Sequence, residues 1–554
     1  MKIKTTSSLE KVFIDDNYEN IPEHKGLSAL KGERISFQAV FSADDSIREN
    51  ETATIILESD LIEHIQVRKV KNIPVEYASY RIRRDDNYLR TTPGLYPDLL
   101  LPMTYVSSEN PYGIIKAIPG LTRALWIDLT IPDDCSSGIH KISLTLRSEI
   151  CETSCEYCIN VLNETLPEQD LIYTEWFHCD ALANYYRVPV FSDEHFEIIR
   201  NYVKTAVKNG INMILVPVFT PPLDTEIGGE RLTTQLVKVI KNGNDYSFEY
   251  DLLDRFLDML KEEKVKYYEI AHLFTQWGSY HAPKVMAYEN GEYKKIFGWE
   301  TDSVSDEYVG FLRAFLVSFL NHMKSRGEDK KCYFHISDEP NKDHLESYMN
   351  CKKAIEDLLE GYPIMDALSN FGFYQSGIVK MPVPASDHIE PFIEAGIKDL
   401  WTYYCSGQSV GVSNRLIAMP SYRNRFIGLQ MYKYDIKGFL QWGYNFFNNR
   451  FSHDEIEPYI ETSGEFWVPA GDTCSVYPER TGHAYESIRI IVFNEGIQDM
   501  RALKLCEKYY SKEEIITEIE KIYGKSIVFS ECVKSADVML KIREKIYDMI
   551  ESKI

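Results

Sequence analysis

Residues 196–219, FEIIRNYVKTAVKNGINMILVPVF, contain a helix pattern and a strand pattern in direct succession. The first half places apolar side chains on one face of a helix, at Phe196, Ile199, Tyr202, Val203, Ala206 and Val207. The pair Asn209-Gly210 is typical of a helix C-terminus, because glycine tolerates the left-handed backbone needed there. The apolar run 211–219 is typical of a strand buried on both faces. This succession predicts an α/β fold built on a parallel sheet.

The same alternation recurs through the central part of the chain. We expect eight strands, at 171–178, 211–219, 267–274, 332–336, 364–368, 381–384, 400–405 and 439–446. Helical patterns lie between them, for example at 252–260 and 311–323. Eight strands with interposed helices over residues 168–510 predict a (β/α)8 barrel of the TIM type, with insertions. A doubly wound open sheet is the alternative, but no glycine-rich turn of the dinucleotide-binding type follows the first strand.

The two ends of the chain carry different patterns. Residues 1–167 contain short runs in which apolar and polar side chains alternate, separated by turn signals such as Pro93-Gly94. We expect an antiparallel β-sandwich there. Residues 511–554 are helical in pattern. The sequence therefore predicts a multidomain protein of α/β plus β class: an N-terminal antiparallel β-sandwich (1–167), a (β/α)8 barrel (168–510) and a helical C-terminal tail (511–554).

The chain of 554 residues is strongly acidic, with 61 Lys and Arg against 84 Asp and Glu, which gives a formal net charge of −23. This charge repels phosphate backbones and anionic lipid, so we expect neither a nucleic-acid partner nor insertion into a membrane. The first residues, MKIKTTSSLEKVF, lack the apolar segment of a secretory signal. We expect a cytoplasmic protein, unless a leader was removed, and the sequence leaves open whether it forms a homo-oligomer.

In a (β/α)8 barrel, functional residues collect at the carboxyl ends of the strands. The fourth predicted strand ends in SDEP at 337–340, so two consecutive carboxylates, Asp338 and Glu339, follow a buried apolar run. This placement is costly unless the carboxylates are solvated or used. One interpretation is a helix cap, in which Asp338 or Asn341 caps a helix that begins near His344. The other interpretation is an active-site pair.

Aromatic, amide and acidic side chains gather at the ends of four of the predicted strands. They are Trp176, His178 and Asp180; Gln276 and Trp277; Trp401, Tyr403 and Tyr404; and Gln441, Trp442 and Asn445. This mixture is typical of sugar binding, because rings stack on the apolar face of a pyranose while amides and carboxylates bind its hydroxyls. For each aromatic residue the alternative is packing inside the barrel. The candidate substrate-binding residues of this set are His178, Trp401, Tyr404, Trp442 and Asn445.

The position of the acidic pair limits the possible mechanism. The two carboxyl groups of a retaining glycosidase face each other at ~5–5.5 Å across the scissile bond, and those of an inverting enzyme at ~6.5–9.5 Å. Neighbouring residues on one strand end bracket a sugar ring poorly. They suit a substrate-assisted reaction, in which the 2-acetamido oxygen of the sugar attacks the anomeric carbon. We expect Glu339 to be the general acid/base, with a raised pKa, and Asp338 to orient the acetamido group.

Six motifs spread over the chain carry a family resemblance. They are GERISFQ at 32–38, YPDLLLP at 96–102, SDEP at 337–340, LWTYYC at 400–405, WVPAGDTCSVYP at 467–478 and ESIRIIVFNEGIQD at 486–499. In these motifs the chain resembles the glycoside hydrolase family 123 enzymes, the β-N-acetylgalactosaminidases, and the wider group of proteins that share their barrel domain. The resemblance implies a β-sandwich followed by a (β/α)8 barrel, and a retaining, substrate-assisted mechanism that uses an Asp-Glu pair.

The resemblance also implies roles for single residues. A tyrosine should bind the acetamido oxygen, and the seventh predicted strand offers Tyr403 or Tyr404. We prefer Tyr403, because it shares a strand face with Trp401. Trp442 should form the pocket floor and Asp472 should bind sugar hydroxyls; the alternatives are core packing and a loop turn.

The function implied by the resemblance is the release of non-reducing terminal β-linked N-acetylgalactosamine (GalNAc), for example from glycosphingolipid glycans, through an oxazolinium intermediate. We expect no cofactor and no metal. Three alternatives stay open: a glycosidase acting on another 2-acetamido sugar, a catalytically silent carbohydrate-binding protein on the same barrel, and a metallohydrolase. The last would use His178, Asp180, His272 and His281, but no short histidine motif places two ligands on one helix face.

Overall fold

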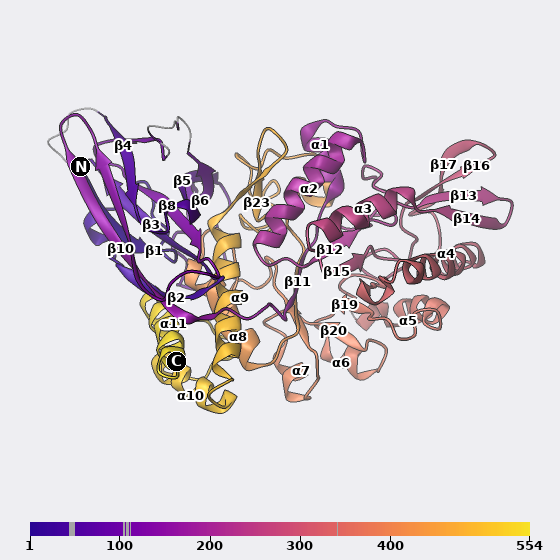
Figure 1. The fold of residues 1–554 in the computed structure, drawn as a ribbon. Coiled ribbons are helices and arrows are strands. Elements are labelled where there is room, and N and C mark those ends of the chain that lie inside the picture. The colour runs from indigo at the N-terminus through magenta and orange to yellow at the C-terminus, as the bar shows by residue number, and fades with distance from the viewer. Residues whose placement is uncertain (44–49, 104–105, 107–109, 111, 341) are drawn as a thin grey trace.

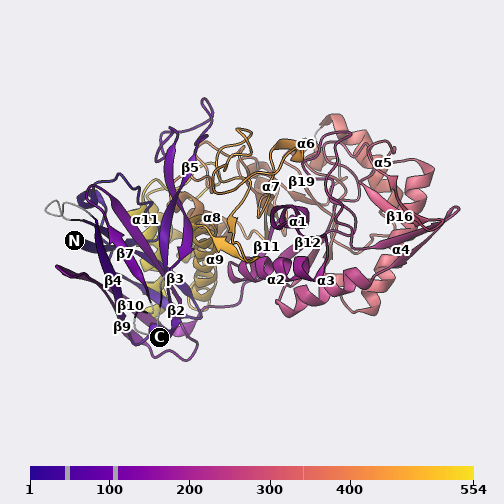
Figure 2. The same cartoon turned by 90° about the horizontal axis from the view of Figure 1, so that it is seen from above.

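The structure is a computed structural model that describes residues 1–43, 50–103, 106, 110, 112–340 and 342–554. Figure 1 shows a β-rich module at the N-terminal end, a larger module of strands and helices beside it, and C-terminal helices that return to the β-rich module. Both chain termini therefore lie at the same end of the molecule, as Figure 2 also shows.

Two five-stranded sheets form the N-terminal module in the described residues. The first sheet has the order β1 (Lys2–Ser7), β3 (Arg34–Ser42), β8 (Thr122–Thr130), β5 (Ile65–Val75) and β6 (Gly94–Pro102). The second has the order β2 (Gly26–Lys31), β10 (Glu152–Thr165), β9 (Gly138–Arg147), β4 (Glu51–Glu58) and β7 (Ile114–Ala117). Apolar side chains that alternate along these strands, such as Phe37, Ile127 and Leu144, form the core of the module.

The expectation of a wholly antiparallel sandwich is wrong at one edge of the second sheet. There β2 pairs with β10 in the parallel direction, whereas the other strand pairs of both sheets are antiparallel. No hairpin joins β2 to β10, so no turn fixes their relative direction.

The central module contains a parallel sheet of six strands and a second parallel sheet of two strands. The six lie in the order β18 (Cys332–Tyr333), β15 (Tyr267–Ile270), β12 (Met213–Val216), β11 (Ile172–Glu175), β22 (Gly438–Gln441) and β21 (Trp401–Tyr403). The two are β19 (Met365–Ala367) and β20 (Met381–Val383). Single parallel bridges, Phe334 to Ile364 and Ala385 to Tyr403, connect the short sheet to both edges of the long one.

The predicted continuous eight-stranded sheet is therefore found only in part. The eight expected strands are all present as short parallel strands, but the ladder is reduced to single bridges on both sides of β19 and β20. Proline explains part of this interruption, since Pro363, Pro382 and Pro384 stand in or next to these strands and cannot donate a backbone hydrogen bond.

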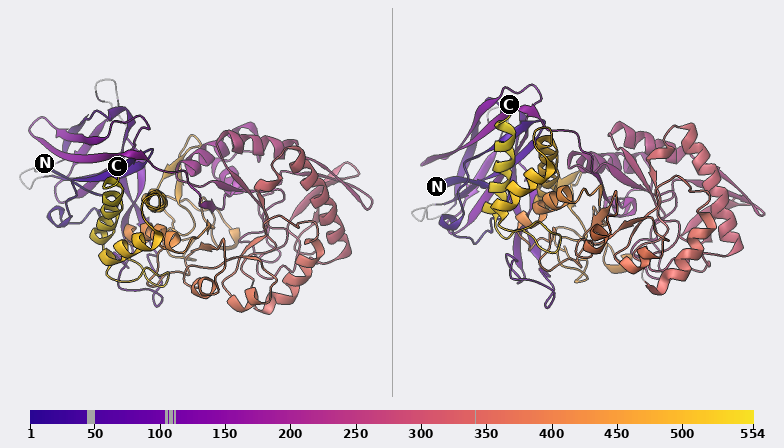
Figure 3. Two further views of the ribbon diagram at one scale, coloured as in Figure 1. Left: turned by 60° about the horizontal axis from the view of Figure 1, so that its bottom comes forward. Right: turned by 90° about the horizontal axis from the view of Figure 1, so that it is seen from below.

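Helices follow the strands of the central module and surround them, as Figure 3 shows. They are α1 (Cys179–Tyr186), α2 (Asp193–Lys208), α3 (Asp251–Glu262), α4 (Asp306–Ser325), α5 (Leu345–Ile355), α6 (Phe371–Gln375), α7 (Glu390–Glu394), α8 (Ser421–Lys433) and α9 (Ile488–Cys506). Two β-hairpins are inserted after β12 and β15, and together they form a four-stranded sheet far from the sandwich. Its strands are β13 (Lys238–Asn242), β14 (Asp245–Glu249), β16 (Val285–Glu289) and β17 (Glu292–Phe297). The sequence did not predict this sheet.

The C-terminal segment forms α10 (Lys512–Tyr523) and α11 (Ala536–Glu551). In α11 the buried Arg543 guanidinium donates to the backbone oxygen of Ser28 and pairs with Glu33 at 2.9 Å, and Tyr547 donates to the same carboxylate. The helical tail is thus tied to the sandwich. None of the helices in the described ranges is long and apolar enough to cross a bilayer.

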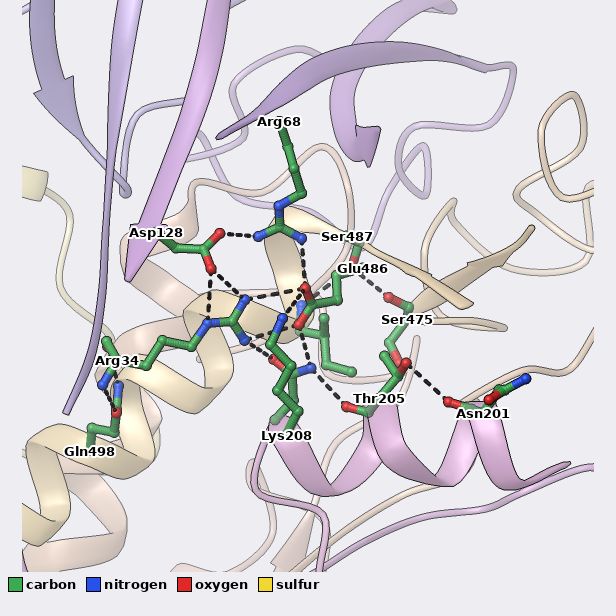
Figure 4. Close-up of polar contacts among 12 residues, drawn as sticks. Arg34, Arg68, Asp128, Asn201, Thr205, Lys208, Ser475, Glu486, Ser487 and Gln498 are labelled. Atoms are coloured by element: carbon green, nitrogen blue, oxygen red, sulfur yellow. Dashed lines mark hydrogen bonds and ion pairs between the residues drawn. The ribbon is translucent and has the colours of Figure 1, made fainter. Parts of the chain in front are cut away.

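A buried network of charges connects the sandwich to the central module (Figure 4). Glu486, at the end of the short hairpin β23 (Val476–Pro478) and β24 (Ala484–Glu486), pairs with Arg34 at 2.9 Å and with Arg68 at 2.6 Å. Both arginines also pair with Asp128 of β8, and Lys208 of α2 reaches Glu486 at 3.1 Å. The two modules are therefore joined by buried ion pairs.

Candidate active site

The ends of the parallel strands surround a cavity of about 250 Å³. Its walls mix apolar, aromatic and acidic side chains: Tyr80, Trp176, His178, Leu223, Asp224, Gln276, Trp277, Asp338, Glu339, Ala367, Tyr403, Cys405, Ser406, Leu440, Trp442, Trp467, Val468 and Asp472. These residues come from both the sandwich and the central module. The predicted residues Asp338, Glu339, Tyr403, Trp442 and Asp472 all lie in this set, as does His178.

The acidic pair sits directly beyond β18. Asp338 is buried, whereas Glu339 is exposed and has a left-handed backbone with φ of 46°, so the two carboxyl groups are in different surroundings. The helix-cap interpretation does not apply to Asp338, because the residue that precedes α5 is His344, which makes no side-chain capping bond. Asn341, the other candidate cap, lies outside the described residues.

Tyr403, at the end of β21, faces Glu339. Its hydroxyl donates a hydrogen bond of 2.7 Å to Oε1 of Glu339, and burial together with this carboxylate raises the pKa of Tyr403 well above its ordinary value. Tyr404 lies on the opposite face of the strand, where its hydroxyl donates to Asn424 of α8 at 2.9 Å. Of the two tyrosines, only Tyr403 lines the cavity.

Charged side chains lie buried near Asp338, on the inner side of the sheet. His335 is 2.7 Å from Glu269 and 3.4 Å from Asp366, and these carboxylates outweigh the effect of burial and raise the pKa of His335 to about 9. Asp366 also accepts hydrogen bonds from the backbone N–H groups of Ile336 and Ser337, so it fixes the chain just before the acidic pair.

The buried carboxyl group of Asp338 has a shifted pKa. Burial, and next the neighbouring carboxylate of Glu339, raise the pKa of Asp338 well above its ordinary value. The expectation from the sequence placed the effect of burial on Glu339. The structure instead buries Asp338 in the segment after β18, whereas Glu339, which has a left-handed backbone, is exposed.

Trp442 and Asp472 form a second cluster in the wall. The indole Nε1 of Trp442 donates to Oδ2 of Asp472 at 3.0 Å, and Gln441 donates to Oδ1 at 3.2 Å. The backbone N–H of Ser406 also donates to Oδ2, at 2.9 Å. Burial nevertheless raises the pKa of Asp472 to about 6. These contacts fix the orientation of both the ring and the carboxylate toward the cavity.

His178 lines the cavity and is held from behind. Its Nε2 lies 3.0 Å from the backbone oxygen of Trp442 and its Nδ1 lies 3.3 Å from Arg231. Burial, and next Arg231, lower the pKa of His178 to about 4. The neutral ring is therefore the form present near pH 7.

Two other candidate substrate-binding residues lie outside the cavity walls, and their predicted role is corrected. The amide of Asn445 is occupied by the backbone of His178, donating at 3.0 Å and accepting at 2.9 Å. Trp401 is buried two residues below Tyr403 on β21, with its ring against Gly438 of the neighbouring strand. Both side chains pack or brace the wall, as Tyr404 does.

Three of the wall residues that the sequence did not predict are polar or aromatic side chains of irregular segments: Tyr80, Asp224 and Trp467. Tyr80 comes from the loop between β5 and β6 of the sandwich and donates to Ser406 at 3.1 Å. Asp224 lies in the loop after β12, and burial raises its pKa to about 6. Trp467 packs on Trp442, with ring centroids 5.4 Å apart. The only sequence signal among them was Trp467, since it begins the motif at 467–478.

The metallohydrolase arrangement is not assembled. Asp180 pairs with Arg231 at 2.8 Å, and His272 stacks on His335 with ring centroids 4.2 Å apart, away from the cavity wall. Across the described ranges, no group of three or more His, Cys, Asp and Glu side chains is arranged to hold a metal ion.

Comparison with known proteins gives one family and one fold. Residues 176–506 match the family described as Glycoside hydrolase 123, catalytic domain. Among solved structures, a family 123 glycoside hydrolase from Clostridium perfringens, studied for glycolipid glycan hydrolysis, is similar in fold over 100% of this chain and 98% of its own, with a TM-score of 0.73 and 16% identity. An endo-β-1,4-mannanase from Thermotoga petrophila matches 61% of this chain and 78% of its own at 10% identity, with a TM-score of only 0.33. No curated protein sequence matches the chain.

Proposed function

Because the chain belongs to the glycoside hydrolase 123 family, we propose that it is an exo-acting, retaining enzyme that releases terminal β-linked GalNAc by substrate-assisted catalysis. The observation that carries this proposal is the cluster of Asp338, Glu339 and Tyr403 in one wall of a cavity of about 250 Å³. The carboxyl group of Asp338 is buried, that of Glu339 is exposed, and the hydroxyl of Tyr403 is a hydrogen-bond donor. An acetamido-assisted reaction requires these three groups.

In the proposed first step, the N–H of the acetamido group donates to Asp338 and its carbonyl oxygen accepts from Tyr403. That oxygen attacks the anomeric carbon, and the bond from this carbon to the glycosidic oxygen breaks. Glu339 gives its proton to the leaving oxygen, so the products are an oxazolinium ion and a free alcohol. In the second step Glu339 takes a proton from water, which attacks the anomeric carbon and restores the acetamido group.

The raised pKa of Asp338 supports the role proposed for this residue. In the free enzyme the raised pKa of Asp338 favours a proton on the buried carboxyl. A bound acetamido N–H favours the carboxylate form of Asp338, since the amide is a donor. Glu339 is the group that faces the leaving oxygen in the proposed reaction.

The opposite wall supports recognition of the sugar ring. Trp442 and Trp467 present aromatic faces, and Asp472 and Asp224 present carboxylate oxygens that can accept from sugar hydroxyls. Asp472 is fixed by Trp442, which leaves little entropy to lose on binding. The preference for the galacto configuration is part of the proposal and rests on the family alone.

We further propose that the six-stranded and two-stranded sheets act as one (β/α)8 barrel. The two parallel bridges that flank β19 and β20 support this proposal, as does the position of the cavity at the carboxyl ends of the strands, where barrel enzymes carry their active sites. Glycosphingolipid glycans are the proposed natural substrates, in line with the glycolipid glycans named for the C. perfringens enzyme.

A panel of 4-nitrophenyl β-glycosides of GalNAc, GlcNAc, galactose and glucose tests the proposal. We expect turnover of the GalNAc glycoside, with the galactoside slower by orders of magnitude because it lacks the acetamido nucleophile. Glu339→Gln and Asp338→Asn should each lower kcat by ~10²–10⁴-fold. Equal rates on the GalNAc and galactose glycosides would reject substrate assistance, and a parent protein that binds GalNAc without turning it over would be a silent binding protein.

A further inference from the structure

A second cavity, of about 280 Å³, adjoins the first at Glu339, which lines both. We call it the side pocket and define it by Glu339, Pro340, Ala367, Ser369, Asn370, His388 and Tyr403. Three of these residues, Glu339, Ala367 and Tyr403, also line the main cavity. The two cavities therefore adjoin at these three residues.

From this arrangement we infer that the side pocket binds the neutral sugar to which the terminal GalNAc is attached. The inference rests on the proposed function. A general acid must touch the glycosidic oxygen, and that oxygen joins the released sugar to the next one. If the released sugar occupies the main cavity, the next sugar lies on the far side of Glu339. The side pocket is the second cavity that Glu339 lines.

The side chains of the side pocket have the chemistry of a sugar site. Oδ1 of Asn370 accepts from the backbone N–H of Phe373 at 2.9 Å, which holds the side chain in place. Within the described residues its amide nitrogen makes no hydrogen bond, so both N–H donors are free for a ligand. Ser369 lies between Tyr403 and the backbone of Ala385, whose N–H donates to its hydroxyl at 3.1 Å.

His388 is held from outside the pocket. Its Nδ1 lies 2.6 Å from Asp387, which also accepts from Gln408 at 2.9 Å, so the ring is fixed by a chain of two side chains. When Nδ1–H donates to Asp387, Nε2 is left as an acceptor for a hydroxyl. The ring itself is about half exposed.

The lining favours a neutral sugar over other parts of a glycoconjugate. A lipid chain in the side pocket would leave the amide, the hydroxyl and the imidazole of its lining without hydrogen-bond partners, which is costly. An anionic sugar would need a cation, and the pocket contains no Lys or Arg but does contain Glu339. Neutral donors and acceptors on short side chains match the hydroxyls of a hexose.

The test compares two substrates that differ in the group to which the GalNAc is linked: the disaccharide GalNAc-β1,3-galactose and the 4-nitrophenyl glycoside. Two variants probe the pocket, His388→Ala and Asn370→Asp; the second keeps the oxygen that accepts from Phe373 and removes the N–H donors. His453→Ala is the matched control, because His453 is an exposed histidine paired with a carboxylate, Glu226, at 2.8 Å outside both cavities. Melting temperatures of all variants are measured alongside.

We expect both pocket variants to lower kcat/KM on the disaccharide by about tenfold, the value of one or two hydrogen bonds, and to change it less than about twofold on the 4-nitrophenyl glycoside. His453→Ala should leave both values unchanged. In one outcome the parent enzyme hydrolyses both substrates and the pocket variants keep the parent's ratio of kcat/KM on the disaccharide to kcat/KM on the 4-nitrophenyl glycoside. That result would overturn the side-pocket assignment alone. A parent that hydrolyses neither would overturn the proposed function, and the assignment with it.

Discussion

The hydroxyl of Tyr403 donates a hydrogen bond of 2.7 Å to Oε1 of Glu339, and both residues line the two cavities. In the proposed reaction the acetamido oxygen of the substrate takes the place of Glu339 as the acceptor. The same bond therefore holds the acid before substrate binds and supplies a donor for the nucleophile afterwards.

Replacement of Tyr403 by phenylalanine removes that donor and keeps the ring. We expect Tyr403→Phe to lower kcat on 4-nitrophenyl β-GalNAc by about 10²-fold, the usual effect of losing one donor to a developing charge. Initial rates over a range of substrate concentrations separate kcat from KM. Tyr404→Phe is the control, since its hydroxyl bonds Asn424 outside the cavity; it should keep kcat within about twofold. An unchanged kcat in Tyr403→Phe would remove Tyr403 from the mechanism.

Asp472 makes stability depend on pH. Burial raises its pKa from an ordinary 3.8 to about 6, so between these values the folded protein binds a proton that the unfolded chain has released. The free energy of unfolding therefore falls as pH rises through this window, by at most about 3 kcal/mol. Asp472→Asn does not titrate. We expect its melting temperature, relative to the parent, to rise between pH 4 and pH 7.

That comparison is made by thermal melting of parent and variant at several pH values. The variant should also bind substrate less tightly at pH 7, because the amide offers one acceptor oxygen in place of two. A difference in melting temperature that is independent of pH would mean that Asp472 is ionised throughout the window, contrary to the raised pKa.

The acidic pair was predictable because its signal is local. A buried strand that ends in two carboxylates is visible in six residues of sequence, and strand alternation correctly placed Tyr403 and Tyr404 on opposite faces. Trp401 shows the limit of this reasoning. It shares a face with Tyr403, but it lies two residues, or about 6.6 Å, further from the cavity, and alternation does not report depth.

Residues that enter the cavity from irregular segments were not predictable. Tyr80 belongs to a loop of a different module, and Asp224 to a loop without periodicity, so neither has a pattern that reports its position. The inserted hairpins after β12 and β15 were missed for the same reason. Conversely, three of the family motifs contain Arg34, Asp98 and Glu486, which are buried ion-pair residues where the modules meet rather than cavity residues. The motifs thus contain residues of the interface between the sandwich and the central module as well as residues of the candidate active site.

Tyr80 gives the sandwich a direct part in the cavity. We expect Tyr80→Ala to raise KM on 4-nitrophenyl β-GalNAc by several-fold, because the ring forms part of the wall and its hydroxyl braces Ser406, which in turn holds Asp472. Tyr77→Ala serves as the control: Tyr77 lies on the same loop, 5.9 Å from Tyr80 between ring centroids, but outside the wall. Equal effects of the two variants would show that the loop only supports the fold.

The ion-pair network around Glu486 predicts a strong and specific loss of stability. Although burial alone would raise its pKa, Arg34, Arg68 and Lys208 hold the pKa of Glu486 well below its ordinary value. Glu486→Gln leaves two buried guanidinium groups with one carboxylate, which costs about 3–5 kcal/mol. Thermal melting should show a large decrease for this variant and a much smaller one for Asp357→Asn, which breaks the exposed pair with Arg313. Comparable decreases would contradict a strong contribution of this network to stability.

Close packing of α8 on α9 gives the last prediction. A Cβ atom at Gly428 of α8 would lie 2.0 Å from the backbone oxygen of Gly496 in α9, so Gly428→Ala must separate the two helices and should destabilise the protein by about 1–3 kcal/mol. Gly310 of α4 is also inside a helix, but a Cβ there meets nothing within 4 Å. Gly310→Ala should therefore stabilise by about 0.5–1 kcal/mol, the ordinary gain of alanine over glycine in a helix. Opposite shifts of the melting temperature are expected for the two substitutions, and shifts of the same sign would contradict the close approach at Gly428.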